Sequence, residues 1–379
     1  MEEALAAAVA KREADGSRRR LTVLSDANVD FCSNDYLGFA RSEALAAAIG
    51  HGGHGSTGSR LVTGTTQLHL DVEEELAAFY GFPAALVFNS GYLANLSVLS
   101  AVPQPGDTVL YDALVHNSCR EGLRLGRAAA VAFAHNDVAD LRAQLAAAPA
   151  TGNKLVVVES VYSMDGHVAP LADMVAVCKA FGAALIVDEA HGCAVDGPHG
   201  AGVVRRLGLE RDVFCCIYTF GKGMGIHGAA VCGPPVLKEY LVNYARPFVY
   251  STSLPPADML TIRAAHAHCA SAAGDAARCR LATRIARFRQ QVVLAGAIPL
   301  ASLLESATAI QGVVVPGNDR ALAAAAHLRL RGFNVVAIRA PTVPLGSERL
   351  RIILHAYNSD SEIDALVAHL ATFLATANL

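Results

Sequence analysis

The chain has 379 residues, of which 53% are hydrophobic and 17% are charged, and its formal net charge at pH 7 is −3. This composition excludes intrinsic disorder and gives no basic surface of the kind that binds nucleic acid. A chain of this length has more residues than a single hydrophobic core usually accommodates. We therefore expect two domains, or one large α/β domain with a smaller part attached to it.

The cysteine usage and the N-terminal residues indicate a compartment. Nine cysteines are too sparse for a disulfide scaffold, and none form a C-x-x-C pair, which is typical of a reducing environment and disfavours structural zinc. The N-terminus lacks the apolar core of a secretory signal, and the longest uncharged stretch, 76–106, contains several glycines and prolines. The last three residues, 377–379, only loosely resemble a peroxisomal address. We therefore expect a cytoplasmic protein without a membrane span.

In chain order, residues 1–20 are predicted to form an amphipathic helix that ends in a cluster of three arginines, Arg18 to Arg20. From about residue 70, apolar runs typical of strands alternate with helical patterns. The predicted strands are 84–88, 108–112, 129–133, 154–160, 184–190, 213–220 and 228–233. The predicted helices between them include 71–80, 92–101, 137–147 and 171–181. Strands that are apolar throughout and separated by helices predict a mostly parallel sheet covered on both faces.

Beyond the Pro255–Pro256 pair the pattern changes to a helix-rich stretch, then short strands and a last helix over 360–374. The short strands are predicted at 310–315, 333–338 and 349–355. We predict an N-terminal arm (1–35), a large cofactor-binding domain (36–245) and a smaller C-terminal α+β domain (246–379).

Three predicted strands end in residues whose side chains can take part in catalysis. The segment LIVDEAHG places Asp188 at a strand end with His191 three residues later, and YTFGKGMG places Lys222 between glycines. ESVYSMDG ends a third strand with Glu159, followed by Ser163. The carboxyl ends of parallel strands gather functional side chains. A lysine, an acid and a histidine in such a place match what pyridoxal 5′-phosphate (PLP) needs: a Schiff-base lysine, an acid for the pyridine nitrogen and a ring that covers the cofactor.

A phosphate-binding turn is predicted in NSGYLAN (89–95), which follows a strand and opens a helix. The amides of Gly91 and Tyr92 there could bind a phosphate at the helix N-terminus. Alone, the same pattern is also that of an ordinary capped turn.

Two G-x-G-x-x-G matches offer a competing interpretation as a dinucleotide site. The match beginning at Gly223 is followed by another strand and no acid at the required spacing, and the match beginning at Gly53 lacks a preceding strand. We therefore disfavour nicotinamide binding. The histidine-containing HGGHG (51–55) is interpreted as a glycine hinge, so no metal site is expected.

Motifs over nearly the whole chain resemble those of the α-oxoamine synthases, fold-type I PLP enzymes that condense an amino acid with an acyl thioester. They are SNDYLG (33–38), GSTGSRLVTGTTQLHLDVEEELA (55–77), FAHNDV (133–138), SVYSMDG (160–166), VDEAHG (187–192), TFGKGMG (219–225), YSTSLPP (250–256) and PTVPLGSERLRI (341–352). The resemblance implies a large domain with a mostly parallel sheet, a smaller C-terminal domain and a homodimer.

The resemblance also implies roles for residues around the cofactor ring. Lys222 would form the Schiff base, Asp188 would pair with the pyridinium nitrogen, and His116 would stack on the ring. Ser163 and His191 would contact the region of the phenolic oxygen, with Glu159 behind them.

At the phosphate, the resemblance implies Gly91, Tyr92 and Thr219, joined by Ser251 and Thr252 from the partner subunit. For the substrates it implies that Arg351 binds the amino-acid carboxylate near Asn34, and that Thr342 and Arg18 face the acyl group. The stretch between Arg18 and the SNDYLG motif is short compared with the family.

The implied reaction is a decarboxylating condensation of L-alanine with pimeloyl-CoA, or with the carrier-protein thioester, in biotin biosynthesis. Other members of the family, using glycine or a different acyl thioester, stay open as alternatives. A non-catalytic synthase subunit is a further alternative, against which the intact pair of Lys222 and Asp188 argues.

Overall fold

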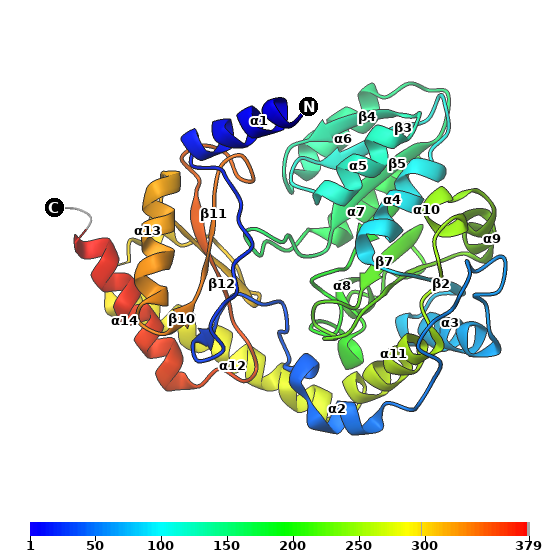
Figure 1. Ribbon diagram of the computed structural model, residues 1–379. Coiled ribbons are helices and arrows are strands. Elements are labelled where there is room, and N and C mark those ends of the chain that lie inside the picture. The colour runs from blue at the N-terminus through cyan, green and yellow to red at the C-terminus, as the bar shows by residue number, and fades with distance from the viewer. Residues whose placement is uncertain (297, 377–379) are drawn as a thin grey trace. The chain divides into compact units, whose positions relative to one another are not determined.

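The computed structural model describes residues 1–296 and 298–376. The chain forms two compact units (Figure 1). Unit 1 comprises Met1–Tyr36, Ser163–His167 and Cys279–Leu379, and unit 2 comprises Leu37–Tyr162 and Val168–Arg278. The domain boundaries predicted above stay a prediction.

In the structure, helix α11 (Pro256–Cys269), which lies within the predicted small domain, packs on α3 (Gln67–Tyr80) of unit 2.

Unit 2 is built on a seven-stranded sheet in the order β2-β8-β7-β6-β5-β3-β4 (Figure 1). Its strands are β2 (Ala84–Phe88), β3 (Thr108–Asp112), β4 (Ala129–Phe133), β5 (Lys154–Glu159), β6 (Ala184–Asp188), β7 (Cys215–Thr219) and β8 (Ala229–Gly233). Five neighbouring strands, from β7 to β4, are parallel, which confirms the mostly parallel sheet. Only β8 runs antiparallel to its two neighbours, because the short 220–228 connection from β7 cannot make the crossover that a parallel pair needs.

Unit 2 also contains helices, several of which pack on its sheet. They are α2 (Glu43–Ala48), α3, α4 (Gly91–Ala101), α5 (Asn117–Leu125), α6 (Val138–Ala147), α7 (Leu171–Phe181), α8 (Val203–Arg206), α9 (Pro235–Tyr244), α10 (Arg246–Val249) and α11, with 3-10 turns at Phe39–Arg41 and Pro198–Gly200. One core packs α4, α5, α9 and α10 against the apolar side chains of the sheet, among them Leu86, Val157 and Ile217. Burial of this apolar surface is the main force that holds the unit together.

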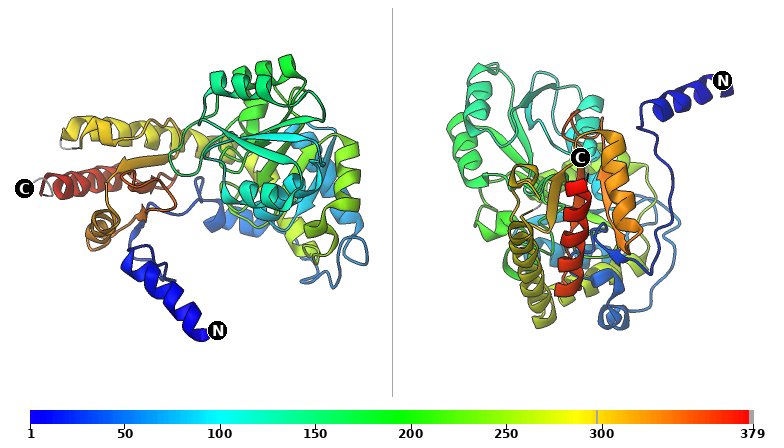
Figure 2. Two further views of the ribbon diagram at one scale, coloured as in Figure 1. Left: turned by 90° about the horizontal axis from the view of Figure 1, so that it is seen from above. Right: turned by 90° about the vertical axis from the view of Figure 1, so that its left-hand side faces the viewer.

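Unit 1 contains a three-stranded antiparallel sheet in the order β11-β12-β9, formed by β11 (Val336–Ile338), β12 (Arg349–Ile353) and β9 (Ile310–Val314). A two-stranded parallel ladder joins β1 (Val29–Asp30) to β10 (Phe333–Asn334). The helices are α1 (Glu2–Ala14), α12 (Ala272–Ala295, in unit 1 from Cys279 onward), α13 (Asn318–Arg329) and α14 (Asp360–Thr376), with a 3-10 turn at Leu300–Ser302. Helices α13 and α14 lie side by side (Figures 1 and 2).

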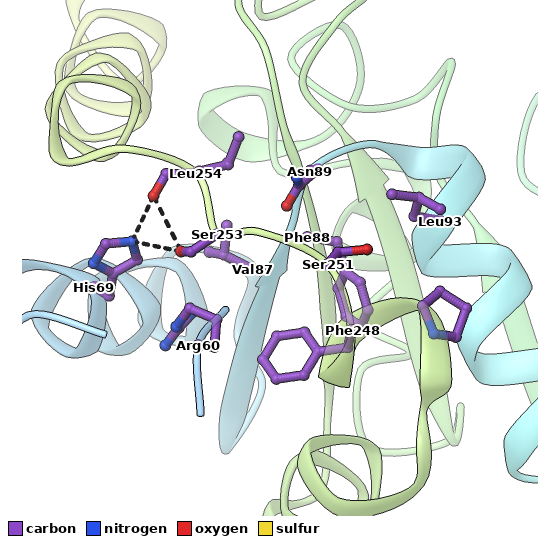
Figure 3. Close-up of a pocket in the computed structure, with 11 residues that line it drawn as sticks. Arg60, His69, Val87, Phe88, Asn89, Leu93, Phe248, Ser251, Ser253 and Leu254 are labelled. Atoms are coloured by element: carbon purple, nitrogen blue, oxygen red, sulfur yellow. Dashed lines mark hydrogen bonds between the residues drawn. The ribbon is translucent and has the colours of Figure 1, made fainter. Parts of the chain in front are cut away.

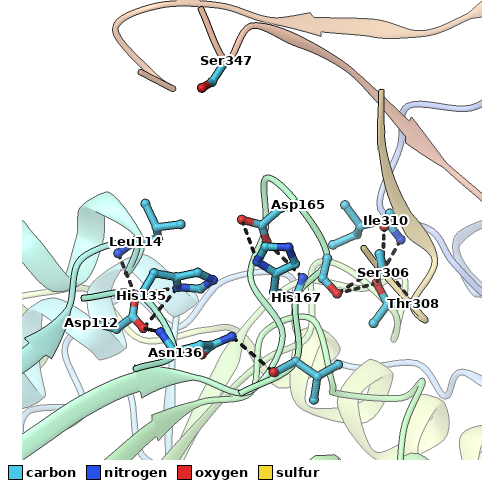
Figure 4. Close-up of polar contacts among 12 residues, drawn as sticks. Asp112, Leu114, His135, Asn136, Asp165, His167, Ser306, Thr308, Ile310 and Ser347 are labelled. Atoms are coloured by element: carbon cyan, nitrogen blue, oxygen red, sulfur yellow. Dashed lines mark hydrogen bonds and ion pairs between the residues drawn. The ribbon is translucent and has the colours of Figure 1, made fainter. Parts of the chain in front are cut away.

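The segment 163–167 joins unit 1 through hydrogen bonds. Ser306 Oγ donates to Gly166 O at 3.2 Å, and Thr308 Oγ1 donates to the same carbonyl at 3.3 Å (Figure 4). Arg351 Nε donates to Ser163 O at 2.7 Å. These bonds hold the segment near both of its ends, at Ser163 and Gly166. The segment follows β5, the strand that ends at Glu159.

Some sequence predictions need correction in detail. The predicted helix over 1–20 ends at Ala14, because Gly16 takes a left-handed φ of 62° that terminates it, and none of its residues is buried. The arginine cluster therefore lies outside the helix. Strand β4 is not covered on both faces, since Ala129 to Ala132 are exposed at the sheet edge. The predicted strand 333–338 is divided between β10 and β11, which pair with different partners.

The uncharged stretch 76–106 forms the end of α3, then β2 and α4. Among the helices within the described residues, none has both the length and the apolar character needed to cross a membrane.

Candidate active site

The carboxyl ends of β5, β6 and β7 meet at one edge of the sheet in unit 2. Glu159 is paired in register with Asp188, and Asp188 with Ile217, two residues before Thr219. Lys222 lies in the connection that follows β7. The parallel pairing therefore brings together the three strand ends from which the sequence predicted a site.

Asp188 is buried, with 4% of its surface exposed, and both of its carboxylate oxygens are engaged. Asn95 Nδ2 donates to Oδ2 at 2.6 Å, and the backbone N–H of Ala190 donates to Oδ1 at 2.9 Å. Asn95 comes from α4, and the sequence analysis did not select it. Asn95 lies four residues after Gly91, so the two residues lie on the same face of the helix. That spacing is the feature of the sequence from which Asn95 could have been selected.

Asn95 also connects Asp188 to His116. Its Nδ2 donates to Ser118 Oγ at 3.0 Å, and that hydroxyl lies 2.7 Å from His116 Nδ1. The side-chain oxygen of Asn95 is buried and has no hydrogen-bond partner among the described residues. A buried acceptor without a partner is uncommon and marks a place where a ligand can contribute.

His116 stands at the N-cap of α5 and is tied to the strand ends through its backbone. Its backbone N–H donates to Glu159 Oε1 at 2.6 Å, and its Nδ1 accepts from the N–H of Ser118 at 3.2 Å. Desolvation lowers the pKa of His116, and the positive charge of Lys222 acts in the same direction, against the opposing effect of Asp188. A neutral imidazole suits a side chain that covers an aromatic ring.

Glu159 is almost fully buried, with 2% of its surface exposed. Burial raises its pKa well above the usual range, and the neighbouring charge of Asp188 raises it further. Two carboxyl groups at adjacent strand ends do not both ionise easily in a desolvated site. Asp188 therefore stands beside an acid that favours its protonated form.

Lys222 Nζ lies 2.8 Å from His191 Nε2, which belongs to the turn after β6. Two glycines that follow Lys222 are required by close packing: a Cβ on Gly223 would lie 2.5 Å from Cys193 O, and one on Gly225 would lie 2.3 Å from Ala40 N. These contacts explain the G-x-G-x-x-G pattern. Strand β8, instead of a helix, follows it, so the dinucleotide interpretation is wrong.

The predicted phosphate turn lies between β2 and α4. Ser90 is the N-cap of α4, and its Oγ accepts from Leu93 N at 3.3 Å. An ideal Cβ on Gly91 would lie 1.9 Å from Thr219 Oγ1, so only glycine brings this backbone so close to the end of β7. The amides of Gly91 and Tyr92 are in the first helical turn, where N–H groups have no intrahelical acceptor.

Ser251 and Thr252 follow α10, and Ser251 lies near the end of β2 (Figure 3). Asn89 Nδ2 donates to the carbonyl of Thr252 at 2.9 Å. Neither of the two hydroxyls makes a hydrogen bond within the part of the chain that the structure describes. A small pocket next to them is lined by Arg60, Phe248 and other residues drawn in Figure 3.

A further pair lies at the end of β3 in unit 2. His135 Nδ1 is 2.9 Å from Asp112 Oδ1, and the backbone N–H of Asn136 donates to Asp112 Oδ2 at 2.8 Å (Figure 4). These contacts hold the FAHNDV segment against the strand end. The sequence analysis quoted this motif without giving it a role.

In unit 1, two of the predicted substrate residues, Asn34 and Arg351, contact each other, and Arg351 is buried on β12. Arg351 donates from Nε to Ser163 O at 2.7 Å and from NH2 to Asn34 Oδ1 at 3.0 Å. Tyr36 OH donates to the same Asn34 oxygen at 3.2 Å. The guanidinium is thus oriented by its neighbours, which suits it for bidentate binding of a carboxylate.

Arg18 and Thr342 also belong to unit 1, and among the described residues they form no hydrogen bond or ion pair with each other. Arg18 pairs with Glu13 of α1, and the neighbouring Arg19 donates from NH2 to Thr342 Oγ1 at 3.2 Å. The basic residue next to Thr342 in this structure is therefore Arg19. Apart from Ser163, the predicted cofactor residues belong to unit 2, and the predicted substrate residues belong to unit 1.

The residues of unit 2 fit PLP. The close approach of Gly91 to Thr219 leaves a turn of backbone amides for a phosphate, Asp188 offers a buried carboxylate to a ring nitrogen, and Lys222 offers an amine. The unpartnered oxygen of Asn95 lies in the same group.

Comparison with known proteins agrees with this fit. The family model described as aminotransferase class I and II matches residues 27–370. An 8-amino-7-oxononanoate synthase from Marinobacter nauticus is 44% identical to the chain over 353 residues, which cover 90% of this chain and 86% of the relative. An 8-amino-7-oxononanoate synthase from Burkholderia mallei is 41% identical over 365 residues, with 94% and 91% covered.

Among solved structures, a variant of serine palmitoyltransferase from S. paucimobilis with bound PLP–myriocin is 30% identical and superposes with a TM-score of 0.88. The superposition covers 98% of this chain and 96% of that one. These matches confirm the resemblance inferred from the motifs and the predicted fold class. The chain belongs to the aminotransferase class I and II family of PLP-dependent enzymes, and within it to the α-oxoamine synthases.

Proposed function

We propose that the chain is a PLP-dependent C-acyltransferase that condenses L-alanine with a pimeloyl thioester of CoA or of a carrier protein. The reaction forms a carbon–carbon bond between the alanine α-carbon and the acyl carbonyl, and it releases the thiol and CO2. The product is 8-amino-7-oxononanoate, in biotin biosynthesis. The identity to curated synthases of this name over at least 90% of the chain supports the choice of substrates.

The observation that carries the chemistry is the strand-end group of Lys222, His191 and Asp188. When bound, PLP supplies an electron-withdrawing ring that stabilises negative charge on the amino-acid α-carbon. The Asp188 carboxylate would hold a proton at the ring nitrogen, and Asn95 would keep that carboxylate in place through its 2.6 Å hydrogen bond. His116 would cover one face of the ring.

Lys222 would bind the cofactor and later move the proton of the alanine α-carbon, because its amine is the basic group of this edge. His191 Nε2, 2.8 Å from Nζ, would orient the amine and exchange a proton with it. Arg351, held by Asn34 and the Ser163 carbonyl, would bind the carboxylate of alanine. Thr342 and Arg18 would face the acyl group, with Ser163 and Glu159 supporting the ring side of the site.

We also infer a cytoplasmic homodimer in which Ser251 and Thr252 reach the cofactor phosphate of the partner subunit. Thr252 is exposed and Ser251 is partly exposed, and neither hydroxyl has a hydrogen-bond partner within the described residues, so both are available to a ligand outside their own segment. We also propose that each subunit has the three predicted parts: the N-terminal arm (1–35), the large domain (36–245) and the small domain (246–379).

The test is a panel of thioesters assayed for thiol release with L-alanine and with glycine. We expect the highest kcat/KM with L-alanine and the pimeloyl thioester. A clear preference for glycine, or for an acetyl, succinyl or long-chain thioester, would assign the chain to a different α-oxoamine synthase. No turnover on the whole panel, with PLP bound, would favour a non-catalytic subunit.

The dimer is tested by complementation. A Lys222→Ala chain and a chain with both Ser251→Ala and Thr252→Ala are each inactive in the proposed arrangement. Mixed dimers contain one site with both defects and one with neither, so activity reappears. Mixed dimers with verified exchange that stay inactive would show that the two hydroxyls serve the chain that carries them.

A further inference from the structure

The 251–254 segment, from Ser251 to Leu254, is held to the rest of unit 2 mainly through its backbone. Ser253 N donates to Gly58 O at 3.0 Å, and Ser56 Oγ donates to Ser253 O at 2.8 Å. Asn89 Nδ2 donates to the carbonyl of Thr252. The 56–58 stretch that makes two of these bonds has no regular secondary structure of its own. Ser59 also pairs with Thr252 in an isolated antiparallel bridge. A side-chain anchor for this segment comes from α3.

That anchor is His69, in the first turn of α3, with 1% of its surface exposed. Its Nε2 lies 3.0 Å from the carbonyl oxygen of Leu254 and 3.2 Å from Ser253 Oγ (Figure 3). Its Nδ1 lies 3.3 Å from the backbone nitrogen of Thr66 and 2.9 Å from Thr66 Oγ1. Both ring nitrogens are therefore engaged, one with its own helix and one with the segment.

The partners of His69 select one tautomer. A carbonyl oxygen can only accept, so Nε2 must carry the hydrogen that it donates to Leu254 O. A backbone N–H can only donate, so Nδ1 must be the unprotonated nitrogen that accepts from Thr66. A neutral ring with hydrogen on Nε2 satisfies all of these contacts, and a doubly protonated ring does not. Burial lowers the pKa of His69, which agrees with a neutral ring.

One turn further along α3, Glu73 ties the helix to the sheet. Its carboxylate is fully buried and accepts from Val87 N of β2 at 3.0 Å, and it pairs with Arg60 at 2.7 Å and with Lys238 at 2.8 Å. Strand β2 continues directly into the turn with Gly91. The 251–254 segment is thus connected through His69 and α3 to the same strand that carries the chain's own phosphate turn.

We propose that His69 is a positioning residue that sets the affinity of the partner subunit's site for the cofactor phosphate, by fixing the 251–254 segment that presents Ser251 and Thr252. The inference rests on the proposed homodimer. Its consequence is specific: a defect at His69 appears in the site of the other subunit, and the site of its own chain is spared.

The experiment uses His69→Phe, which keeps a ring and removes both hydrogen bonds, in dimers assembled from two differently tagged chains. Lys222→Ala silences one site, so only the other site can form the lysine-bound cofactor, whose absorbance is titrated with PLP. In the first arrangement, one chain is unchanged and the other carries both Lys222→Ala and His69→Phe. In the second arrangement, one chain carries His69→Phe and the other carries Lys222→Ala.

In the first arrangement the working site depends on the altered segment, and we expect the Kd for PLP to be about tenfold higher than in the dimer with Lys222→Ala alone. In the second arrangement the working site receives an unaltered segment, and the Kd should be unchanged. Both dimers contain the same substitutions, so a general loss of stability cannot separate them. His69→Gln, which keeps a donor and an acceptor, should recover part of the affinity.

The matched control is His266→Phe in α11. His266 is another buried histidine with both ring nitrogens bonded, to Tyr80 OH at 2.9 Å and to Ile262 O at 2.8 Å. Among the described residues, His266 forms no hydrogen bond with the 251–254 segment. We expect a lower melting temperature with an unchanged Kd for PLP in both arrangements.

Equal Kd values for PLP in the two arrangements of His69→Phe would overturn the proposal. A defect confined to the second arrangement would also overturn it and would show that the hydroxyls serve their own chain. If the unaltered protein binds no PLP, the proposed function itself fails. If it binds PLP and is active while the two arrangements behave alike, only the role of His69 fails.

Discussion

Asn95 on α4 donates a 2.6 Å hydrogen bond to Asp188 Oδ2 at the end of β6. The bond joins a helix and a strand 93 residues apart in sequence, and both side chains are buried. It fixes the orientation of the carboxylate that faces the cofactor ring in the proposed function. A buried charged group of this kind depends on its hydrogen-bond partners.

Replacement of Asn95 by Ala should therefore lower kcat without unfolding the protein. We expect a loss of roughly 10- to 100-fold in kcat with L-alanine, because an orienting partner of the acid is removed. Asn243→Ala on the surface of α9 is the control, since the side chain of Asn243 donates to Glu239 O and to no other group among the described residues. Steady-state kinetics measure both, and an Asn95→Ala enzyme as active as the control would contradict this role.

Asp188→Asn keeps the size of the side chain and removes the charge that holds a proton at the ring nitrogen. The proposed function predicts a loss of roughly a thousandfold or more in turnover, by analogy with other charge-orienting carboxylates. Binding of PLP should change much less. Turnover is followed by thiol release and binding by absorbance titration. Near-normal turnover would mean that another acid serves the ring.

Lys222 should be the lysine that carries the cofactor. The purified protein should absorb near the visible edge, and Lys222→Ala should lose the lysine-bound band while retaining weak cofactor binding. Borohydride reduction followed by peptide mapping identifies the labelled residue, with Lys179→Ala as a control on a surface helix. A label on any lysine other than Lys222 would refute the assignment.

The close approach of Gly91 to Thr219 predicts a double-mutant effect in stability. Gly91→Ala places a methyl group where Thr219 Oγ1 lies, 1.9 Å from the ideal position, so we expect a destabilisation of about 1–3 kcal/mol. Adding Thr219→Ala removes the clashing oxygen and should restore most of that loss. Urea unfolding of the four proteins measures the coupling. Additive effects would show that the backbone moves to accept the methyl group.

His266 predicts a pH dependence of stability. Burial lowers its pKa from 6.5 to about 4. As the pH falls below 6.5, the unfolded chain takes up a proton that the folded protein does not bind until about pH 4. The histidine therefore contributes a loss of about 3 kcal/mol in the free energy of unfolding across this range.

His266→Gln should flatten the stability profile between pH 7 and pH 4, and His54→Gln, at an exposed histidine, should leave it unchanged. Urea unfolding at several pH values gives both profiles. If His266→Gln and the unaltered protein lose stability in parallel as the pH falls, the histidine takes up its proton in the folded protein as readily as in the unfolded chain.

The class of the fold and the location of the chemistry along the chain could both be inferred from the amino-acid pattern. Apolar strands separated by helices predict a parallel sheet, and residues such as Asp188 and Lys222 follow strands, so their common edge could be inferred before the structure was known. The motifs around them led to the family, because their order and spacing extend over nearly the whole chain.

Which side chains support these residues depends on how the folded helices and strands pack together. Asn95, Ser118 and His69 act on partners that are distant in sequence, through hydrogen bonds that depend on how helices pack on the sheet. The hydrophobic periodicity of a helix or strand indicates which of its faces is buried. It does not indicate which polar groups from other elements will contact that face. The antiparallel direction of β8 was decided by the length of one connection, and the end of α1 at Ala14 was decided by the left-handed Gly16.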